Sequence, residues 1–250
     1  MSSVNVRERE ILRLLAEGAS ISPRELSVKL GVSAVTIRKD LRKLADQGLM
    51  IVGRGGARPA FHPSIRDRQA RMAEEKNRIA KAAAGLVRDG DRVMIVAGTT
   101  TALVARHLFG KRDVHVVTTS TLLLPHVRVN PALTVTLVGG EFRPEMEGVV
   151  GPVAIGAIRQ FNARLVFVGT DGFSAERGVT AHFVEEAEIA QAMAGQAEQV
   201  VLLADASKHG RAGFARMFPL ERVSLLITDT RLDDAARARL EEHRVSVMRV

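Results

Sequence analysis

Several features are missing from the sequence. It contains no cysteine, which excludes disulfides and thiolate metal sites. No apolar run reaches the length of about 18 residues that a membrane-spanning helix needs. The first ten residues are polar and charged and lack the apolar segment of a secretory signal. The seven histidines are scattered without the spacing of zinc ligands. We therefore expect a cytoplasmic protein that holds no metal and no cofactor.

Positive charge is concentrated at the front of the 250-residue chain, whose net charge is +8. Residues 1–60 hold 11 Lys or Arg against 6 Asp or Glu, whereas residues 79–250 hold 20 against 19. This asymmetry favours a polyanion such as nucleic acid as the partner of the N-terminal part. A generic basic surface that results from arginine-rich codon usage is the alternative.

Apolar spacing in the front part predicts helices over residues 4–17, 23–30 and 34–47. Ser22 and Glu25 form a capping box at the start of the second helix. Ser33 ends a tight turn and caps the third helix. The predicted buried stripe of the third helix comprises Ile37, Leu41 and Leu44.

The opposite face of the third helix has the composition of a recognition helix. Small residues at its start allow close approach to base edges, and basic residues behind them reach phosphates. These residues are Ala34, Val35, Arg38, Lys39 and Arg42. After Gly48, an apolar strand and a glycine-rich tip predict a wing, whose Arg54 and Arg58 lie near DNA. A three-helix scaffold with a solvated basic face is the alternative.

Residues 32–41, followed by Leu44 to Leu49 and the wing at residues 55–57, resemble the DeoR-type helix-turn-helix. The resemblance implies that five residues face DNA: Ser33, Thr36, Arg38, Lys39 and Arg42. Asp40 is then a structural or charge-balancing residue. The family pattern usually has a second arginine where Lys39 stands, a change that keeps the charge but loses the bidentate fork.

The remainder of the chain has the rhythm of an α/β domain. A linker is expected over residues 59–64 and a helix over residues 66–87. Seven apolar runs follow, most of them separated by helical segments, at residues 93–96, 114–117, 135–138, 165–168, 200–204, 225–227 and 245–250. This alternation predicts a mostly parallel sheet covered on both faces. We expect a winged helix-turn-helix domain over residues 1–58, a linker and bridging helix over residues 59–78, and an α/β domain over residues 79–250.

Polar or glycine-rich groups follow five of these strands. Ligands of open α/β sheets bind beyond the carboxyl ends of the strands, near a switch in strand order. A threonine cluster at the start of a helix over residues 101–108 suits an anion, and Lys208 adds a positive charge. Asp171 and Glu141 can accept hydrogen bonds from sugar hydroxyls, so a phosphorylated sugar or polyol fits. The predicted effector-binding residues are Gly98, Thr99, Thr100, Thr101, Thr119, Ser120, Gly140, Glu141, Asp171, Gly172 and Lys208. The alternatives are N-capping threonines and a solvated lysine.

The same half resembles the DeoR C-terminal sensor domain, which is related in fold to sugar-phosphate isomerases and deaminases. The matching stretches are residues 91–101, 116–120, 137–141, 168–172 and 203–208. The resemblance adds Arg143 to the effector-binding residues. Thr119 stands where the family often has asparagine, and Phe183 stands where relatives tend to have asparagine. Both departures alter the expected pocket, so the effector's identity does not carry over.

The related enzymes make catalysis an alternative. Asp171 and Glu141 could act as bases, but Phe173 stands where the deaminase pattern requires histidine. We therefore expect no catalytic residues and no enzyme. The favoured interpretation is a homo-oligomeric repressor, dimer or tetramer, of a sugar or polyol catabolic operon that a phosphorylated sugar releases from double-stranded DNA. The competing interpretations are an isomerase-like enzyme with an appended DNA-binding module and an architectural DNA protein that ignores metabolites.

Overall fold

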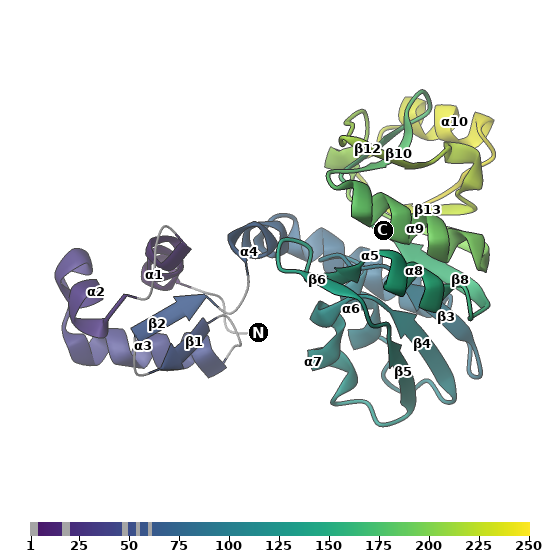
Figure 1. Cartoon of the computed structure of the whole chain (residues 1–250). Coiled ribbons are helices and arrows are strands. Elements are labelled where there is room, and N and C mark those ends of the chain that lie inside the picture. Colours follow the sequence, from purple (N-terminus) through teal and green to yellow (C-terminus); the bar gives the residue numbers. More distant parts are fainter. Residues whose placement is uncertain (1–4, 17–20, 47–49, 54–55, 60–61) are drawn as a thin grey trace. The chain divides into compact units, whose positions relative to one another are not determined.

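A computed structural model of the chain describes residues 5–16, 21–46, 50–53, 56–59 and 62–250 (Figure 1). The chain divides into two compact units, Met1–Asp67 and Arg68–Val250, here called unit 1 and unit 2. Helix α4 (Pro63–Ala70) contains the boundary between them. Within the described ranges, none of the helices has the length and apolar composition that crossing a membrane requires.

Unit 1 has three helices followed by an antiparallel hairpin. The helices are α1 (Val6–Ala16), α2 (Pro23–Leu30) and α3 (Ala34–Asp46), and the strands are β1 (Met50–Gly53) and β2 (Gly56–Pro59). The predicted capping box is present, because Ser22 Oγ accepts from the Glu25 amide at 3.2 Å and Glu25 Oε2 accepts from the Ser22 amide at 2.7 Å. The helices enclose a core that includes Ile11, Leu15 and Leu26. The predicted stripe of Ile37, Leu41 and Leu44 belongs to the same core.

Unit 2 is built on a seven-stranded sheet with the order β14-β13-β11-β8-β3-β4-β5, in which all neighbours are parallel. Its strands are β3 (Arg92–Ile95), β4 (Val114–Thr118), β5 (Leu133–Leu137), β8 (Ala163–Val168), β11 (Ala197–Leu203), β13 (Leu225–Thr228) and β14 (Ser246–Arg249). Each corresponds to one of the seven apolar runs, so the predicted parallel α/β fold is confirmed. From β3 the chain adds β4 and β5 toward one edge of the sheet (Figure 1). The next strand of the sheet, β8, pairs with the other side of β3, so the strand order reverses between β3 and β8.

Both faces of this sheet are covered, because alternate residues of its inner strands enter two separate cores. In β3, Val93 and Ile95 pack with α5 (Ala73–Gly85) and α6 (Ala102–Arg106). Met94 enters the opposite core, which α8 (Pro152–Ile158), α9 (Val184–Gly195) and α10 (Asp234–Glu242) complete. A strand buried on both faces reads as a continuous apolar run, which explains the pattern in the sequence.

The expected helix over residues 66–87 is two helices. Helix α4 ends at Ala70 and α5 begins at Ala73. Between them Met72 adopts a left-handed conformation with φ 55°, which interrupts the helix. The sequence contains no glycine or proline there to signal this break. The helix expected over residues 101–108 is also shorter, because α6 covers only Ala102–Arg106.

Two small antiparallel sheets lie outside the prediction. One pairs β6 (Glu141–Arg143) with β7 (Gly148–Val150), and the other has the order β12-β10-β9. The strands of the second sheet are β9 (Gly172–Ser174), β10 (Gly178–Ala181) and β12 (Ala215–Phe218). Three or four residues are too few for an alternating pattern to be recognised. The remaining elements are the helix α7 (Leu124–Val127) and three 3₁₀ turns, η1 (Thr121–Leu123), η2 (Ala206–Lys208) and η3 (Leu220–Arg222).

Candidate functional site

The outer face of α3 presents a row of cations to solvent. Arg38, Lys39 and Arg42 are exposed, and none of them forms an ion pair with another residue in the described part of the chain. Val35 near the helix start is 73% exposed and Ala34 is half-buried, so small apolar groups stand in front of the cations. This is the order that base edges and phosphates require of a helix in a major groove.

Two hydroxyls at the start of α3 serve the helix itself. Ser33 Oγ accepts from the Thr36 amide at 3.1 Å, as the prediction of a cap requires. The same oxygen lies 2.9 Å from Thr36 Oγ1, within hydrogen-bond distance. The two side chains therefore hold each other at the helix start, and the hydroxyl that accepts in this pair keeps its own proton to donate to a phosphate.

The inner side of α3 is held to α1 by two ion pairs. Asp40 is 6% exposed and accepts from Arg7 Nε at 2.6 Å and from Arg7 Nη2 at 3.2 Å. Glu8, 1% exposed, accepts from Lys43 Nζ at 2.7 Å. These contacts agree with the structural role expected for Asp40 and leave the outward cations available for a polyanion.

The wing residues are described only in part. Strands β1 and β2 form an antiparallel hairpin, and β2 covers part of the segment that was expected to be the glycine-rich tip. Ile21 pairs with Ala57 of β2 through two backbone hydrogen bonds of 3.3 and 3.1 Å. Arg54 lies outside the described residues, as does the side chain of Arg58. Their contacts with DNA stay predictions.

In unit 2, a cavity opens where the strand order reverses, between the carboxyl ends of β3 and β8. It is lined by the loops that follow β3, β8 and β11 and by residues of three helices. The lining residues are Arg68, Lys76, Ala97, Gly98, Thr99, Thr100, Gly169, Thr170, Asp171, Glu186, Leu203, Ala204, Asp205 and Lys208. Such a reversal is where open α/β sheets bind ligands. The free space inside is about 40 Å³.

Three cationic side chains from three different elements line this cavity. Lys76 of α5 is 6% exposed and donates from Nζ to the backbone carbonyl of Arg68, in the last turn of α4. Burial lowers the pKa of Lys76 to about 8. Lys208 Nζ lies 3.8 Å from Asp171 Oδ1, and both side chains are partly exposed. The third cation is the Arg68 side chain itself. These three side chains can bind an anion that enters the cavity.

Three acidic side chains line the same cavity. Glu186 of α9 is 7% exposed, and its Oε2 has no hydrogen-bond partner among the described residues. Burial first, and then repulsion by Asp171, raise the pKa of Glu186 to about 7. Asp205 accepts from the Ser207 amide at 3.1 Å and Asp171 from the His182 amide at 2.8 Å. Glu186 is thus the acid whose hydrogen-bonding capacity is least used by the protein.

The structure brings five of the predicted effector residues to the cavity: Gly98, Thr99, Thr100, Asp171 and Lys208. Seven others are not among its lining residues: Thr101, Thr119, Ser120, Gly140, Glu141, Arg143 and Gly172. Effector roles for these seven stay predictions.

Several of these seven have structural roles. The Thr101 hydroxyl donates to the carbonyls of Val96 and Gly98 at 2.7 and 3.1 Å. Gly172 packs so closely that an added Cβ would lie 2.3 Å from the carbonyl oxygen of Arg211. Arg143 lies 3.3 Å from each of the carboxylates of Glu141 and Glu185.

Thr119 and Ser120 are a different case. Both are fully buried after β4, and neither hydroxyl has a hydrogen-bond partner among the described residues. The Thr119 carbonyl and Ala97, a lining residue of the cavity, both lie next to Gly148. The Thr119 backbone therefore lies near the wall of the cavity, whereas neither Thr119 nor Ser120 is among the residues that line it.

Nine lining residues are not among the predicted effector-binding residues, and five of these nine have polar or charged side chains: Arg68, Lys76, Thr170, Glu186 and Asp205. A usable signal existed for two of them. Lys76 precedes the buried Ile79 and Ala80 by three and four residues, and Glu186 precedes Ile189 and Ala190 in the same way. A charged residue within the apolar stripe of a helix must be buried, and buried charges gather at functional sites.

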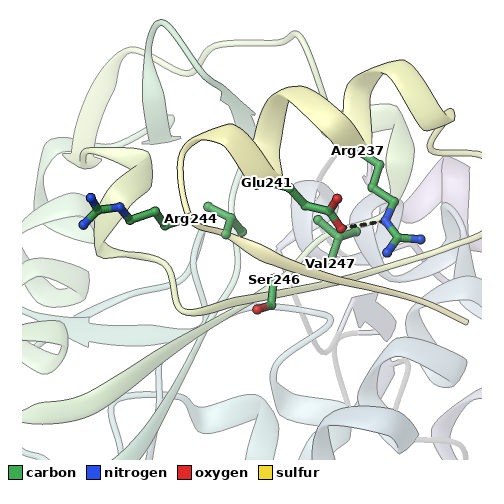
Figure 2. A pocket seen from close by; sticks show the side chains of 6 residues that line it. Arg237, Glu241, Arg244, Ser246 and Val247 are labelled. Atoms are coloured by element: carbon green, nitrogen blue, oxygen red, sulfur yellow. Dashed lines mark hydrogen bonds and ion pairs between the residues drawn. The ribbon is translucent and has the colours of Figure 1, made fainter.

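A larger but open hollow lies at the sheet edge, between α10 and β14 (Figure 2). Arg237 and Glu241 face each other along α10 at 2.7 Å, so their charges neutralise each other. Arg244 extends away from this pair, and Ser246 and Val247 lie on the strand beneath. No predicted site residue lines this hollow. Within the described residues, no group of three His, Cys, Asp or Glu side chains gathers as metal ligands.

Comparison with known proteins relates the chain to regulators along nearly its full length. The HTH-type transcriptional regulator GlpR of Haloferax volcanii is 35% identical over 97% of this chain and 96% of that protein. The HTH-type transcriptional repressor GlcR of Bacillus subtilis is also 35% identical, over 88% of this chain and 86% of that protein. Among solved structures, ribose 5-phosphate isomerase from Plasmodium falciparum is 16% identical, covering 57% of this chain and 55% of that chain with a TM-score of 0.41.

Two family descriptions match successive parts of the sequence. Residues 7–60 match the DeoR-like helix-turn-helix domain, and residues 71–230 match the DeoR C terminal sensor domain. A chain with this sensor domain and with relatives named as regulators is not an isomerase to which a DNA-binding module was added. The protein belongs to the DeoR family and is a DNA-binding transcriptional regulator, not an enzyme.

Proposed function

We propose that the protein represses a sugar or polyol catabolic operon in the cytoplasm and leaves its operator when a phosphorylated sugar or polyol fills the cavity of unit 2. One observation carries the proposal. Arg68, Lys76 and Lys208 converge from three elements on a cavity at the strand-order reversal. Cations suit a phosphate group, and the carboxylates that line the same cavity suit the hydroxyls of a sugar.

In this proposal residues 1–58 bind DNA, residues 79–250 sense the effector, and residues 59–78 connect the two and add Arg68 and Lys76 to the cavity. A homo-oligomer, dimer or tetramer, presents paired α3 helices to repeated half-sites of double-stranded DNA. The proposed DNA-binding residues are Ser33, Ala34, Val35, Thr36, Arg38, Lys39, Arg42, Arg54 and Arg58. Exposure of the α3 cations in the structure supports this assignment.

The contact between Lys76 and Arg68 suggests how the signal leaves the cavity. The Lys76 ammonium donates to a carbonyl at the end of α4, the helix that contains the boundary between the units. A phosphate dianion is a stronger acceptor than a carbonyl and competes for the same ammonium. Effector binding then loosens the end of α4. The change in the free energy of DNA binding cannot exceed the difference between the effector's binding free energies for the protein with the end of α4 intact and with it loosened.

The DNA half is tested by removing cations from α3. We expect Arg38→Ala and Lys39→Ala each to weaken operator binding and to lower its salt slope by about one. Each cation that meets a phosphate releases counterions on binding, so its loss reduces the salt dependence. The measurement is fluorescence anisotropy with an operator duplex from the protein's own promoter at several salt concentrations.

Arg239→Ala on the exposed side of α10 is the matched control and should keep the native affinity and slope. Native affinity and slope in both α3 variants would show that this face does not bind DNA. The effector half is tested by adding sugar and polyol phosphates to the operator complex. A protein that stays on its operator with every such compound does not sense this class.

A further inference from the structure

We infer that Glu186 selects the effector by its hydroxyl groups, its carboxylate accepting hydrogen bonds from two neighbouring hydroxyls while the cations hold the phosphate. The inference rests on the proposed function. It states that the hydroxyl groups of a sugar phosphate make the protein bind it more tightly than inorganic phosphate. It assigns the cations and the Glu186 carboxylate of the cavity to two parts of one ligand molecule.

The geometry of Glu186 points to a missing donor. The side chain is 7% exposed, lines the cavity, and leaves Oε2 buried with no partner in the part of the chain that the structure describes. Buried acceptors without partners are rare because the lost hydration costs free energy. A hydrogen-bond donor that enters with the ligand removes this cost.

The charges around Glu186 decide which donor fits. Arg68 of α4, Lys76 of α5 and Lys208 of η2 line the same cavity, so a cationic ligand would meet three cations. Asp171 and Asp205 line it as well, so a phosphate placed directly at Glu186 would be repelled. A neutral hydroxyl is repelled neither by the cations nor by the carboxylates. A carboxylate with two oxygens fits two adjacent hydroxyls, as in the diol of a phosphorylated sugar or polyol.

This arrangement links ligand binding to the protonation of the Glu186 carboxyl group. The pKa of Glu186 is about 7, raised by burial and by Asp171 and opposed by Arg68 and Lys208. Hydroxyl donors stabilise the ionised carboxylate, so binding of a sugar phosphate favours loss of a proton. Affinity for hydroxylated phosphates should therefore increase as pH rises through 7. Phosphate itself also titrates in this range, so the comparison needs a variant without the carboxylate.

Glu186→Gln supplies the test, because it keeps the shape and removes the titrating charge. The probes are inorganic phosphate, glycerol 3-phosphate, ribose 5-phosphate, fructose 6-phosphate and sorbitol 6-phosphate, titrated by calorimetry into the full chain. We expect Glu186→Gln to bind inorganic phosphate within about twofold of native. Its affinity for the sugar and polyol phosphates that native protein accepts should fall about ten- to a hundredfold. Any pH dependence beyond that of inorganic phosphate should disappear.

Glu188→Gln, an exposed position on the same helix, is the control and should bind every probe as native protein does. An equal loss for inorganic phosphate and sugar phosphates, or no loss for either, overturns the role of Glu186 and leaves the proposed function intact. A native protein that binds no probe overturns both. Should Glu186→Gln not fold, Glu186→Asp tests the same point, because a shortened carboxylate must lose sugar phosphates and keep inorganic phosphate.

Discussion

At the scale of single residues, the cavity of unit 2 places ionisable groups where water is scarce. Glu186 and Lys76 are both more than nine-tenths buried, and burial is the largest cause of the pKa shift of each. Burying a charged form costs free energy, which a hydrophobic residue at either position would not incur. The protein therefore holds charges in this cavity at the expense of its own stability, as sites built for ligands do.

This cost predicts how stability depends on pH. The pKa of Glu186 rises from 4.5 to about 7 on folding, so between these values the unfolded chain binds fewer protons. The free energy of unfolding therefore falls as pH rises through this window. The shift corresponds to about 3 kcal/mol. Glu186→Gln should remove this fall and be more stable than native protein above pH 7.

Urea unfolding followed by circular dichroism from pH 5 to pH 8 measures the effect. The difference between variant and native protein should widen with rising pH. A constant difference across the range would mean that Glu186 keeps its ordinary pKa in the fold.

At the scale of elements, α1 positions the recognition helix. The Arg7–Asp40 and Glu8–Lys43 pairs join α1 to α3 from its inner side. Both carboxylates are buried, whereas the cations are partly exposed. The carboxylates therefore depend on their partners, and α3 cannot shift relative to α1 without breaking them.

Arg7→Leu should accordingly destabilise unit 1, because the buried Asp40 carboxylate loses its two charge-assisted hydrogen bonds. Arg13→Leu should have a smaller effect on stability, since its pair with Glu10 is exposed and links adjacent turns of one helix. Adding Asp40→Asn to Arg7→Leu should recover part of the loss. Thermal unfolding of the single and double variants gives the coupling energy, and additive losses would argue against the pair.

The elements also show how far sequence reasoning extends. All seven strands of the large sheet were predicted because strands such as β3 are buried on both faces and read as apolar runs. The small sheets were not, because β6 and β9 have three residues each. The break between α4 and α5 depends on the left-handed backbone of Met72, which no residue type there announces.

At the scale of the whole molecule, helix α4 spans the boundary between unit 1 and unit 2. Arg68 in the last turn of α4 lines the cavity, and the same helix reaches back to Pro63 in unit 1. Prediction of the site from sequence was limited by this long-range arrangement. The loops after the strands were expected at one rim, but α5 and α9 also contribute Lys76 and Glu186, whose helical spacing indicates burial without indicating which cavity they line.

Lys208→Ala separates the two activities. The residue lies in the sensing unit, so operator affinity without sugar phosphate should stay within about twofold of native. Release by the sugar phosphate that dissociates the native complex should be lost, because a phosphate contact is removed. Anisotropy titrations of the operator complex measure both. Lys81→Ala on the exposed face of α5 is the control, and release at the native concentration by Lys208→Ala would exclude this lysine from the site.

The size of the cavity has a kinetic consequence. About 40 Å³ accommodates roughly three water molecules, far less than the several hundred Å³ of ordinary ligand pockets. On the proposed function a sugar phosphate enters only when the walls of the cavity move apart, so its rate of binding approaches a ceiling at high concentration. Stopped-flow mixing at rising concentrations of the sugar phosphate would then measure the rate of this opening motion.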